Sequence, residues 1–305
     1  MQTGKLPEKP WRTEAVGRFL ASIFMCWLCG MVILTMLIYF QVPQKSSTAA
    51  FLAYSTGTLA CFAGSIVVIM RPWQFESLLH KLLMLLLFLY GGFLLMWLAQ
   101  RLVTNKDELG NSIVTLLIGV LAFQGAVVAL VHFFLREHHA GGVSGFGFDK
   151  SPWLALLFGA CVGFFALWAT QRLLGLSSEV LELLKIHPQE QETVTILRGT
   201  DDWKDRVLMA VATIAIAPLG EEILFRGILY PWIKRISSPQ IALWITALVF
   251  AAIHLNLAAF VPLVFLAIVL VALYEYTGNL LACIVTHMFF NAANFIALYT
   301  YLGKK

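Results

Sequence analysis

Residues 216–229 read Ile216-Ala-Pro-Leu-Gly-Glu-Glu-Ile-Leu-Phe-Arg-Gly-Ile-Leu229 and place two glutamates and an arginine inside an apolar stretch. An ionisable group inside a membrane is costly, so such groups are rare there and mark functional sites by default. Farther along the chain, two more apolar segments carry one histidine each, His254 and His287. The sequence therefore indicates a polar site within a membrane-embedded region.

Composition supports a membrane location for the whole chain. Of its 305 residues, 60% are hydrophobic and only 12% are charged, whereas about a quarter of the residues in soluble domains are charged. Apolar runs long enough for spans of about 20 residues recur along the sequence. We predict an all-α, polytopic bundle of eight or nine transmembrane helices, located in the cell membrane. The candidate spans are residues 17–40, 49–70, 81–100, 113–135, 152–174, 207–233, 240–257, 259–276 and 279–302.

Two polar breaks divide the apolar runs. Residues 138–150 are rich in glycine, which is typical of a flexible connector. This break separates residues 1–140, an N-terminal four-helix region of unknown role, from residues 145–305, which hold the polar site. The second break covers residues 177–206, where Ser178 precedes acidic residues. This pattern fits the start of a helix lying along the membrane surface, and an ordinary surface loop is the alternative.

Spacing assigns different roles to the charged residues of the opening stretch. Adjacent helical residues point about 100° apart, so Glu221 and Glu222 cannot face one target. Arg226 lies four residues after Glu222, within pairing reach on the same face. We predict that Glu222 pairs with Arg226 while Glu221 faces a cavity as a general base. A purely structural network of ion pairs is the alternative.

The histidine segments add donors on separate helices. His287 and Asn291 are four residues apart, so they share one face of an otherwise apolar helix. Such groups need polar partners inside the bundle, and they can simply join helices. Together with Glu221 and His254, they form a candidate site for activating water and binding an oxyanion. Glu221, His254 and His287 could instead hold a divalent metal such as zinc.

These motifs carry a family resemblance. Glu-Glu-x-x-x-Arg, Phe-x-x-x-His and His-x-x-x-Asn follow one another over residues 221–291, with Ala217-Pro218, Phe225-Arg226-Gly227 and Thr277-Gly278-Asn279-Leu280 nearby. The set resembles the Abi or CPBP family of intramembrane proteases, which includes type II CAAX prenyl endopeptidases and bacteriocin-processing or self-immunity proteins.

The resemblance implies a role for each matching residue. Glu221 matches the catalytic glutamate, which would activate water together with His254, whereas His287 and Asn291 match the oxyanion-stabilising residues. Glu222 and Arg226 match the rest of the first motif and would orient the site. The prenyl endopeptidases of the family remove a C-terminal tripeptide after a lipidated cysteine, so the expected partners are peptides or lipidated peptides and membrane lipid.

Other classes of protein fit less well. A transporter would also place charges in the membrane, but it should show paired broken helices in two related halves, and here the halves differ. A non-catalytic bacteriocin-immunity or scaffold protein would keep the fold with a decayed site, whereas all motif positions are filled. The net charge of +4 gives no argument for nucleic-acid binding.

Overall fold

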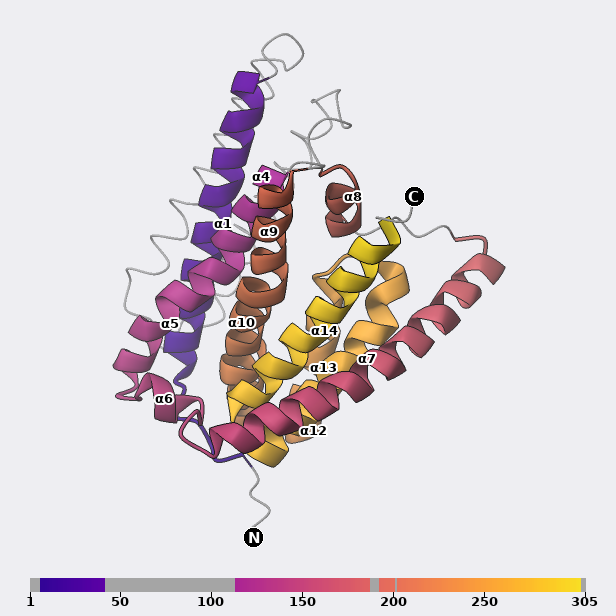
Figure 1. Ribbon diagram of the computed structural model, residues 1–305. Coiled ribbons are helices and arrows are strands. Elements are labelled where there is room, and N and C mark those ends of the chain that lie inside the picture. Colours follow the sequence, from indigo (N-terminus) through magenta and orange to yellow (C-terminus); the bar gives the residue numbers. More distant parts are fainter. Residues whose placement is uncertain (1–5, 42–112, 187–191, 201, 303–305) are drawn as a thin grey trace. The chain divides into compact units, whose positions relative to one another are not determined.

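The structure is a computed structural model that describes residues 6–41, 113–186, 192–200 and 202–302. Every regular element in these residues is helical (Figure 1), which confirms the all-α prediction for this part of the chain. Within the described residues, five helices are long and apolar enough to cross a membrane: Leu116–Glu137, Pro152–Leu183, Trp203–Ile236, Leu257–Thr277 and Leu280–Thr300. The chain is therefore a multi-pass integral membrane protein. The predicted spans 49–70 and 81–100 lie outside the described residues.

The elements follow the chain in a simple order. They are α1 (Thr13–Gln41), α4 (Ile113–Val120), π-helix η2 (Leu121–Gly125), α5 (Ala126–Glu137), α6 (Gly142–Gly145), α7 (Pro152–Leu183), α8 (Glu192–Arg198), α9 (Trp203–Val211), π-helix η3 (Ala212–Ile216), α10 (Ala217–Glu222), π-helix η4 (Ile223–Leu229), α11 (Tyr230–Ile236), α12 (Pro239–Ala252), α13 (Leu257–Thr277) and α14 (Leu280–Leu302).

Two compact units make up the chain. One comprises residues 1–16 and 131–305, and the other comprises residues 17–130. Within the second unit, a Cβ at Gly30 of α1 would lie 2.4 Å from Cβ of Ala122 in η2, so glycine permits these helices to approach closely. The first unit contains all the candidate site residues. The division predicted near residues 140–145 stays a prediction.

Residues 203–236 run as one continuous helical column in which α-helical and π-helical turns alternate. Proline lacks an N–H and cannot donate the usual helical hydrogen bond. Pro218 lies just after η3 and Pro231 lies just after η4, so each π-helical segment ends beside a missing donor. Insertions of π-helix are frequent at functional sites, and here two of them flank Glu221 and Glu222.

α7 packs against α14 through small residues. A Cβ at Gly159 would come within 2.8 Å of the Ala282 carbonyl, and one at Gly163 within 3.0 Å of the Phe289 ring. Thr286 Oγ1 also donates to the Gly159 carbonyl at 2.9 Å. Small residues allow membrane helices to approach at this distance, and the contact fixes the helix that carries His287.

α7 is longer than the sequence predicted. It continues to Leu183, so the separate surface helix expected to begin at Ser178 is wrong. No proline interrupts residues 153–183, and the polar residues near the end extend an existing helix instead of starting a new one. With 32 residues, α7 measures about 48 Å, longer than the hydrocarbon core of about 30 Å.

α12 and α13 are joined by a short turn that carries His254. Ser238 Oγ accepts from the Ile241 N–H at 3.2 Å to begin α12, and Asn256 Oδ1 accepts from the Ala259 N–H at 2.8 Å to begin α13. α12 has only 14 residues and ends at Ala252. The span predicted over 240–257 is therefore a shorter helix, and His254 lies in the turn after it, not on a helix.

The glycine-rich residues of the connector 138–150 serve close packing. Phe146 is buried, and its carbonyl accepts from the Leu280 N–H at 3.0 Å. Gly147 has a φ of +77°, and a Cβ there would lie 2.0 Å from the Gly278 carbonyl. The expectation of a flexible connector is thus wrong for these residues, which pack against the turn between α13 and α14.

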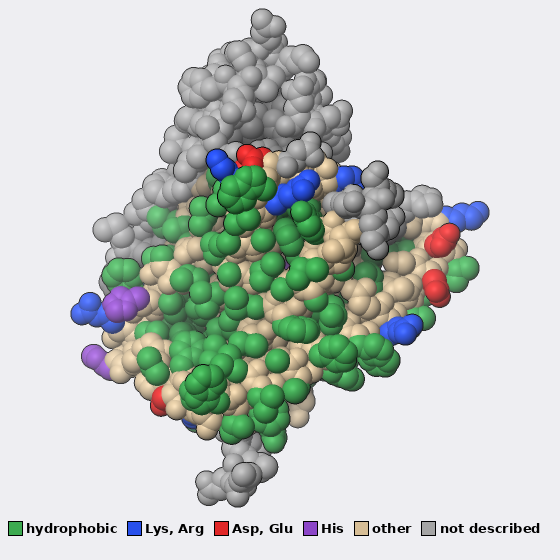
Figure 2. Space-filling model, in the orientation of Figure 1, with side chains coloured by type: hydrophobic (Ala, Val, Ile, Leu, Met, Phe, Trp, Pro, Cys, Tyr) green, Lys and Arg blue, Asp and Glu red, His purple; other side chains and the backbone are tan. Residues whose placement is uncertain are grey.

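The surface agrees with a membrane location. Hydrophobic side chains are spread over much of the described surface seen in Figure 2, and charged side chains lie near its margins. α7 contributes several large exposed apolar residues, including Trp153, Phe164 and Trp168. A contiguous apolar surface of this kind suits contact with lipid.

Candidate active site

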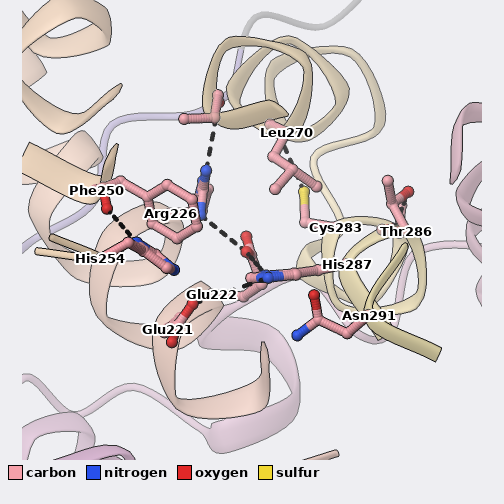
Figure 3. Close-up of polar contacts among 12 residues, drawn as sticks. Glu221, Glu222, Arg226, Phe250, His254, Leu270, Cys283, Thr286, His287 and Asn291 are labelled. Atoms are coloured by element: carbon pink, nitrogen blue, oxygen red, sulfur yellow. Dashed lines mark hydrogen bonds and ion pairs between the residues drawn. The ribbon is translucent and has the colours of Figure 1, made fainter. Parts of the chain in front are cut away.

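Glu222 is the centre of a buried polar cluster (Figure 3). Its Oε1 atom accepts from Arg226 Nη1 at 2.8 Å and lies 2.7 Å from His287 Nδ1. Glu222, Arg226 and His287 are 0%, 1% and 2% exposed. The pairing predicted from the spacing of Glu222 and Arg226 is present, and one carboxylate oxygen links two helical segments distant in sequence.

Arg226 is held on two further sides. Its Nη2 atom donates to the Ala267 carbonyl of α13 at 3.4 Å, and its guanidinium lies 4.6 Å from the ring centroid of Phe250. A desolvated guanidinium over an aromatic face is attracted by the ring quadrupole. Arg226 thus joins η4 to α12 and α13 while it neutralises Glu222.

Glu222 also sets the orientation of His287. Because a carboxylate accepts hydrogen bonds, the contact places a proton on His287 Nδ1 and turns Nε2 the other way. His287 Nε2 lies 3.8 Å from Glu221 Oε2, which is longer than a hydrogen bond. One water molecule can contact both atoms across such a gap, so the geometry suits a shared water between Glu221 and His287.

His254 is anchored in the same way but by a weaker acceptor. Its Nδ1 atom lies 2.7 Å from the Phe250 carbonyl, so Nδ1 donates and Nε2 of the neutral ring carries the lone pair. The Phe250 ring contacts both histidines, with its centroid 4.8 Å from the His254 ring and 5.8 Å from the His287 ring. Figure 3 shows His254 in the same group of side chains as Glu221.

Asn291 donates a hydrogen bond to a backbone carbonyl that has lost its usual donor within the irregular helix. The Ala217 N–H bonds to the Ala212 carbonyl, five residues back, in place of the Thr213 carbonyl. The next residue, Pro218, has no N–H to offer. Asn291 Nδ2 donates to the Thr213 carbonyl at 2.9 Å. One amide hydrogen is therefore used for joining helices, and the predicted contact with an oxyanion requires the second.

Glu221 belongs to the same buried cluster, at 7% exposed. Buried charges must be compensated. Arg226 pairs with Glu222, and His287 contacts Glu222 at 2.7 Å and lies 3.8 Å from Glu221. The structure therefore brings acidic and basic side chains together in one buried cluster.

The structure gives no support for the zinc alternative. Within residues 6–41, 113–186, 192–200 and 202–302, no group of three or more His, Cys, Asp or Glu side chains could hold a metal ion. Glu221 and His287 are neighbours. The His254 ring contacts the Phe250 ring, which in turn contacts the His287 ring. A catalytic zinc site needs three protein ligands, and the described donors do not form such a set.

Sequence reasoning missed several participants. The roles of the Thr213 and Ala267 carbonyls depend on backbone geometry, which no side-chain pattern reveals. Pro218 was the available signal, because a proline inside a helix always deprives an upstream carbonyl of its donor.

Comparison with known proteins agrees with this site. The chain matches the family model of the type II CAAX prenyl endopeptidase Rce1-like proteins over residues 203–293. No curated protein and no solved structure matches it. The matched range contains every candidate site residue, from Glu221 to Asn291. It confirms the resemblance indicated by the motifs: residues 203–293 form a domain of the type II CAAX prenyl endopeptidase Rce1-like family.

Proposed function

We propose that the protein is a glutamate-dependent intramembrane endopeptidase that cleaves C-terminal peptides carrying a prenylated cysteine. We further propose a bundle of eight or nine helices in the cell membrane. One observation carries the reaction: Glu222 bonds to both Arg226 and His287, and His287 Nε2 lies 3.8 Å from Glu221 Oε2. A water molecule placed between Glu221 Oε2 and His287 Nε2 would have a base on one side and a hydrogen-bond donor on the other.

The first step is activation of water. Glu221 accepts a proton from the water while the water oxygen attacks the carbonyl carbon of the scissile peptide bond. His254 Nε2, with its lone pair exposed by the Nδ1 contact to Phe250, orients the same water. General bases contribute about 10²–10⁴-fold to such reactions.

The second requirement is stabilisation of the tetrahedral oxyanion. His287 donates from Nε2 to the oxygen, and the second amide hydrogen of Asn291 is the other donor. Glu222 holds His287 through Nδ1, so the donor is oriented before the substrate arrives. Preorganised donors of this kind are worth about 10²–10³-fold each.

Collapse of the intermediate completes the reaction. The C–N bond breaks, and the proton held by Glu221 passes to the leaving amine nitrogen. The products are a new carboxylic acid on the lipidated cysteine, which then loses its proton to water, and a short released peptide. Glu221 is again ionised, so the cycle consumes only water.

The substrate proposal follows from where the site lies. Apart from His254, which lies in the turn after α12, the site residues come from apolar helices, and a prenyl chain would hold its cysteine at the same membrane. The family match supports a peptide substrate of this class.

A cleavage assay tests the proposal. The purified protein in lipid nanodiscs is given a prenylated peptide, its unprenylated counterpart and a library of general membrane peptides, and products are identified by mass spectrometry. We expect release of a C-terminal tripeptide from the prenylated peptide only, equal rates with and without a chelator, and no release by Glu221→Gln. Activity in Glu221→Gln would overturn the catalytic assignment, and zinc-restorable loss with chelator would favour the metal mechanism instead.

A further inference from the structure

The N-terminal segment Leu6–Thr13 is bound along the C-terminal helices of its own unit. The Leu6 N–H donates to Glu275 Oε2 of α13 at 3.1 Å, and Lys9 Nζ donates to the Gly145 carbonyl at 2.8 Å. Arg235 Nη1 of α11 donates to the Trp11 carbonyl at 3.1 Å. Several independent contacts therefore fix this segment, although it precedes the matched family range by about 190 residues.

Trp11 makes the contact nearest to the active site. Its side chain is fully buried, and its indole Nε1 donates to the Gly227 carbonyl of η4 at 2.9 Å. Gly227 directly follows Arg226, which pairs with Glu222. A residue of the N-terminal segment thus bonds to the backbone beside the central ion pair.

Pro231 removes one backbone donor for the Gly227 carbonyl. In a regular α-helix this carbonyl would accept from the N–H four residues later, but that residue is Pro231. Proline has no N–H, and a buried carbonyl without a donor is costly. The indole of Trp11 supplies a hydrogen bond in place of the missing N–H at position 231.

Packing around the contact leaves little freedom. A Cβ on Gly227 would lie 2.7 Å from the Phe146 ring. Trp11 meets that ring at 6.4 Å and the Phe134 ring at 5.1 Å between centroids, both edge to face. Gly227 is therefore required for close approach, and the indole is held in one orientation by neighbouring aromatic rings.

We propose that Trp11 is a positioning residue of the active site, whose indole N–H holds the Gly227 carbonyl and so fixes the π-helical segment that carries Arg226. The consequence for catalysis rests on the proposed function, because Arg226 orients Glu222 and, through it, His287. Trp11 contacts none of the reacting groups, so its loss should reduce kcat and leave KM unchanged.

The test compares two tryptophans of the same region. Trp11→Phe removes the donor to Gly227, whereas Trp232→Phe removes an indole that donates to Thr13 Oγ1 at 3.2 Å. Trp11→Phe combined with Pro231→Ala returns a backbone N–H to the Gly227 carbonyl. Hydrogen exchange of peptides covering residues 223–231 is measured in nanodiscs for each full-length variant, together with kcat and KM on the prenylated peptide.

We expect Trp11→Phe to accelerate exchange in residues 223–231 and to lower kcat about three- to tenfold, the effect of one hydrogen bond. Pro231→Ala should reverse both changes, and Trp232→Phe should match wild type. Wild-type exchange in Trp11→Phe, an equal effect in Trp232→Phe, or no reversal by Pro231→Ala would each overturn the proposal, as would altered exchange with unchanged kcat. If the wild type cleaves no peptide, the proposed function fails, and the exchange data still decide whether Trp11 holds this segment.

Discussion

α7 and the helical column of residues 203–236 are similar in length and hydrophobicity but differ in burial and in backbone regularity. They have 32 and 34 residues and are about equally apolar. However, 28% of the most apolar window of α7 is buried, against 50% for the column. α7 is a regular helix that packs through glycines, whereas the column has two internal prolines, two π-helical segments and the buried charges. Hydropathy identifies both as membrane helices, and backbone irregularity distinguishes the one that carries the site.

The largest expected difference between the two helices is in activity. Glu221→Gln on the column should lower the rate of peptide cleavage by about 10²–10⁴-fold, because it removes the proposed general base at nearly constant volume. Trp168→Leu on α7, where the side chain is exposed, should leave the rate unchanged. Rates measured on the prenylated peptide check both, and equal rates for the two variants would remove the functional distinction.

The next difference concerns arginines. Arg226→Ala leaves the buried Glu222 without its strongest partner and should lower the free energy of unfolding by about 3–5 kcal/mol. Arg172→Ala is the matched change on α7, where the side chain is exposed, and should stay within about 0.5 kcal/mol of wild type. Thermal unfolding in detergent measures both. If Arg226→Ala melts like wild type, the ion pair does not stabilise the fold.

A third test compares two glycines within α7. A Cβ at Gly159 would press on the backbone of α14, whereas one at Gly175 has no atom within 4 Å. Gly159→Ala should destabilise by about 1–3 kcal/mol through overpacking. Gly175→Ala should be neutral or slightly stabilising, since alanine favours helix by up to about 1 kcal/mol. Equal melting temperatures for the two variants would contradict the close contact between α7 and α14.

The smallest expected effect concerns the link between α14 and the column. Asn291→Ala removes the donor to the Thr213 carbonyl and should cost about 1 kcal/mol, as membrane hydrogen bonds do. Adding Pro218→Ala provides a backbone N–H for that region and should recover part of the loss. Unfolding measurements on the single and double variants give the coupling free energy between positions 218 and 291. Strictly additive effects would mean that the proline does not create the need for Asn291.

Sequence reasoning predicted the residues of the candidate site but not most of the contacts between them. Charges and histidines in apolar segments stand out from composition, and the spacing of Glu222 and Arg226 predicts their contact without a structure. The contact of Glu222 with His287 joins residues 65 positions apart, and no local rule specifies which of the two glutamates approaches the histidine. His254 lies in a turn because α12 ends before it. The sequence does not indicate that end, since apolar residues continue through Ile253. Likewise, the glycine-rich composition around positions 145 and 147 predicts a flexible segment. In the structure these glycines allow close packing instead, because they have no side chain.

The shortness of α12 bears on how water reaches a site among lipids. Its 14 residues extend about 21 Å, roughly a third less than the hydrocarbon core. Such hydrophobic mismatch is relieved by local thinning of the bilayer. Beyond α12, the turn places Leu255 at 93% exposed with a φ of +49°, and its non-helical backbone needs water or protein partners at that depth. We therefore expect the membrane to thin beside His254, so that the aqueous surface itself delivers the attacking water without a separate channel.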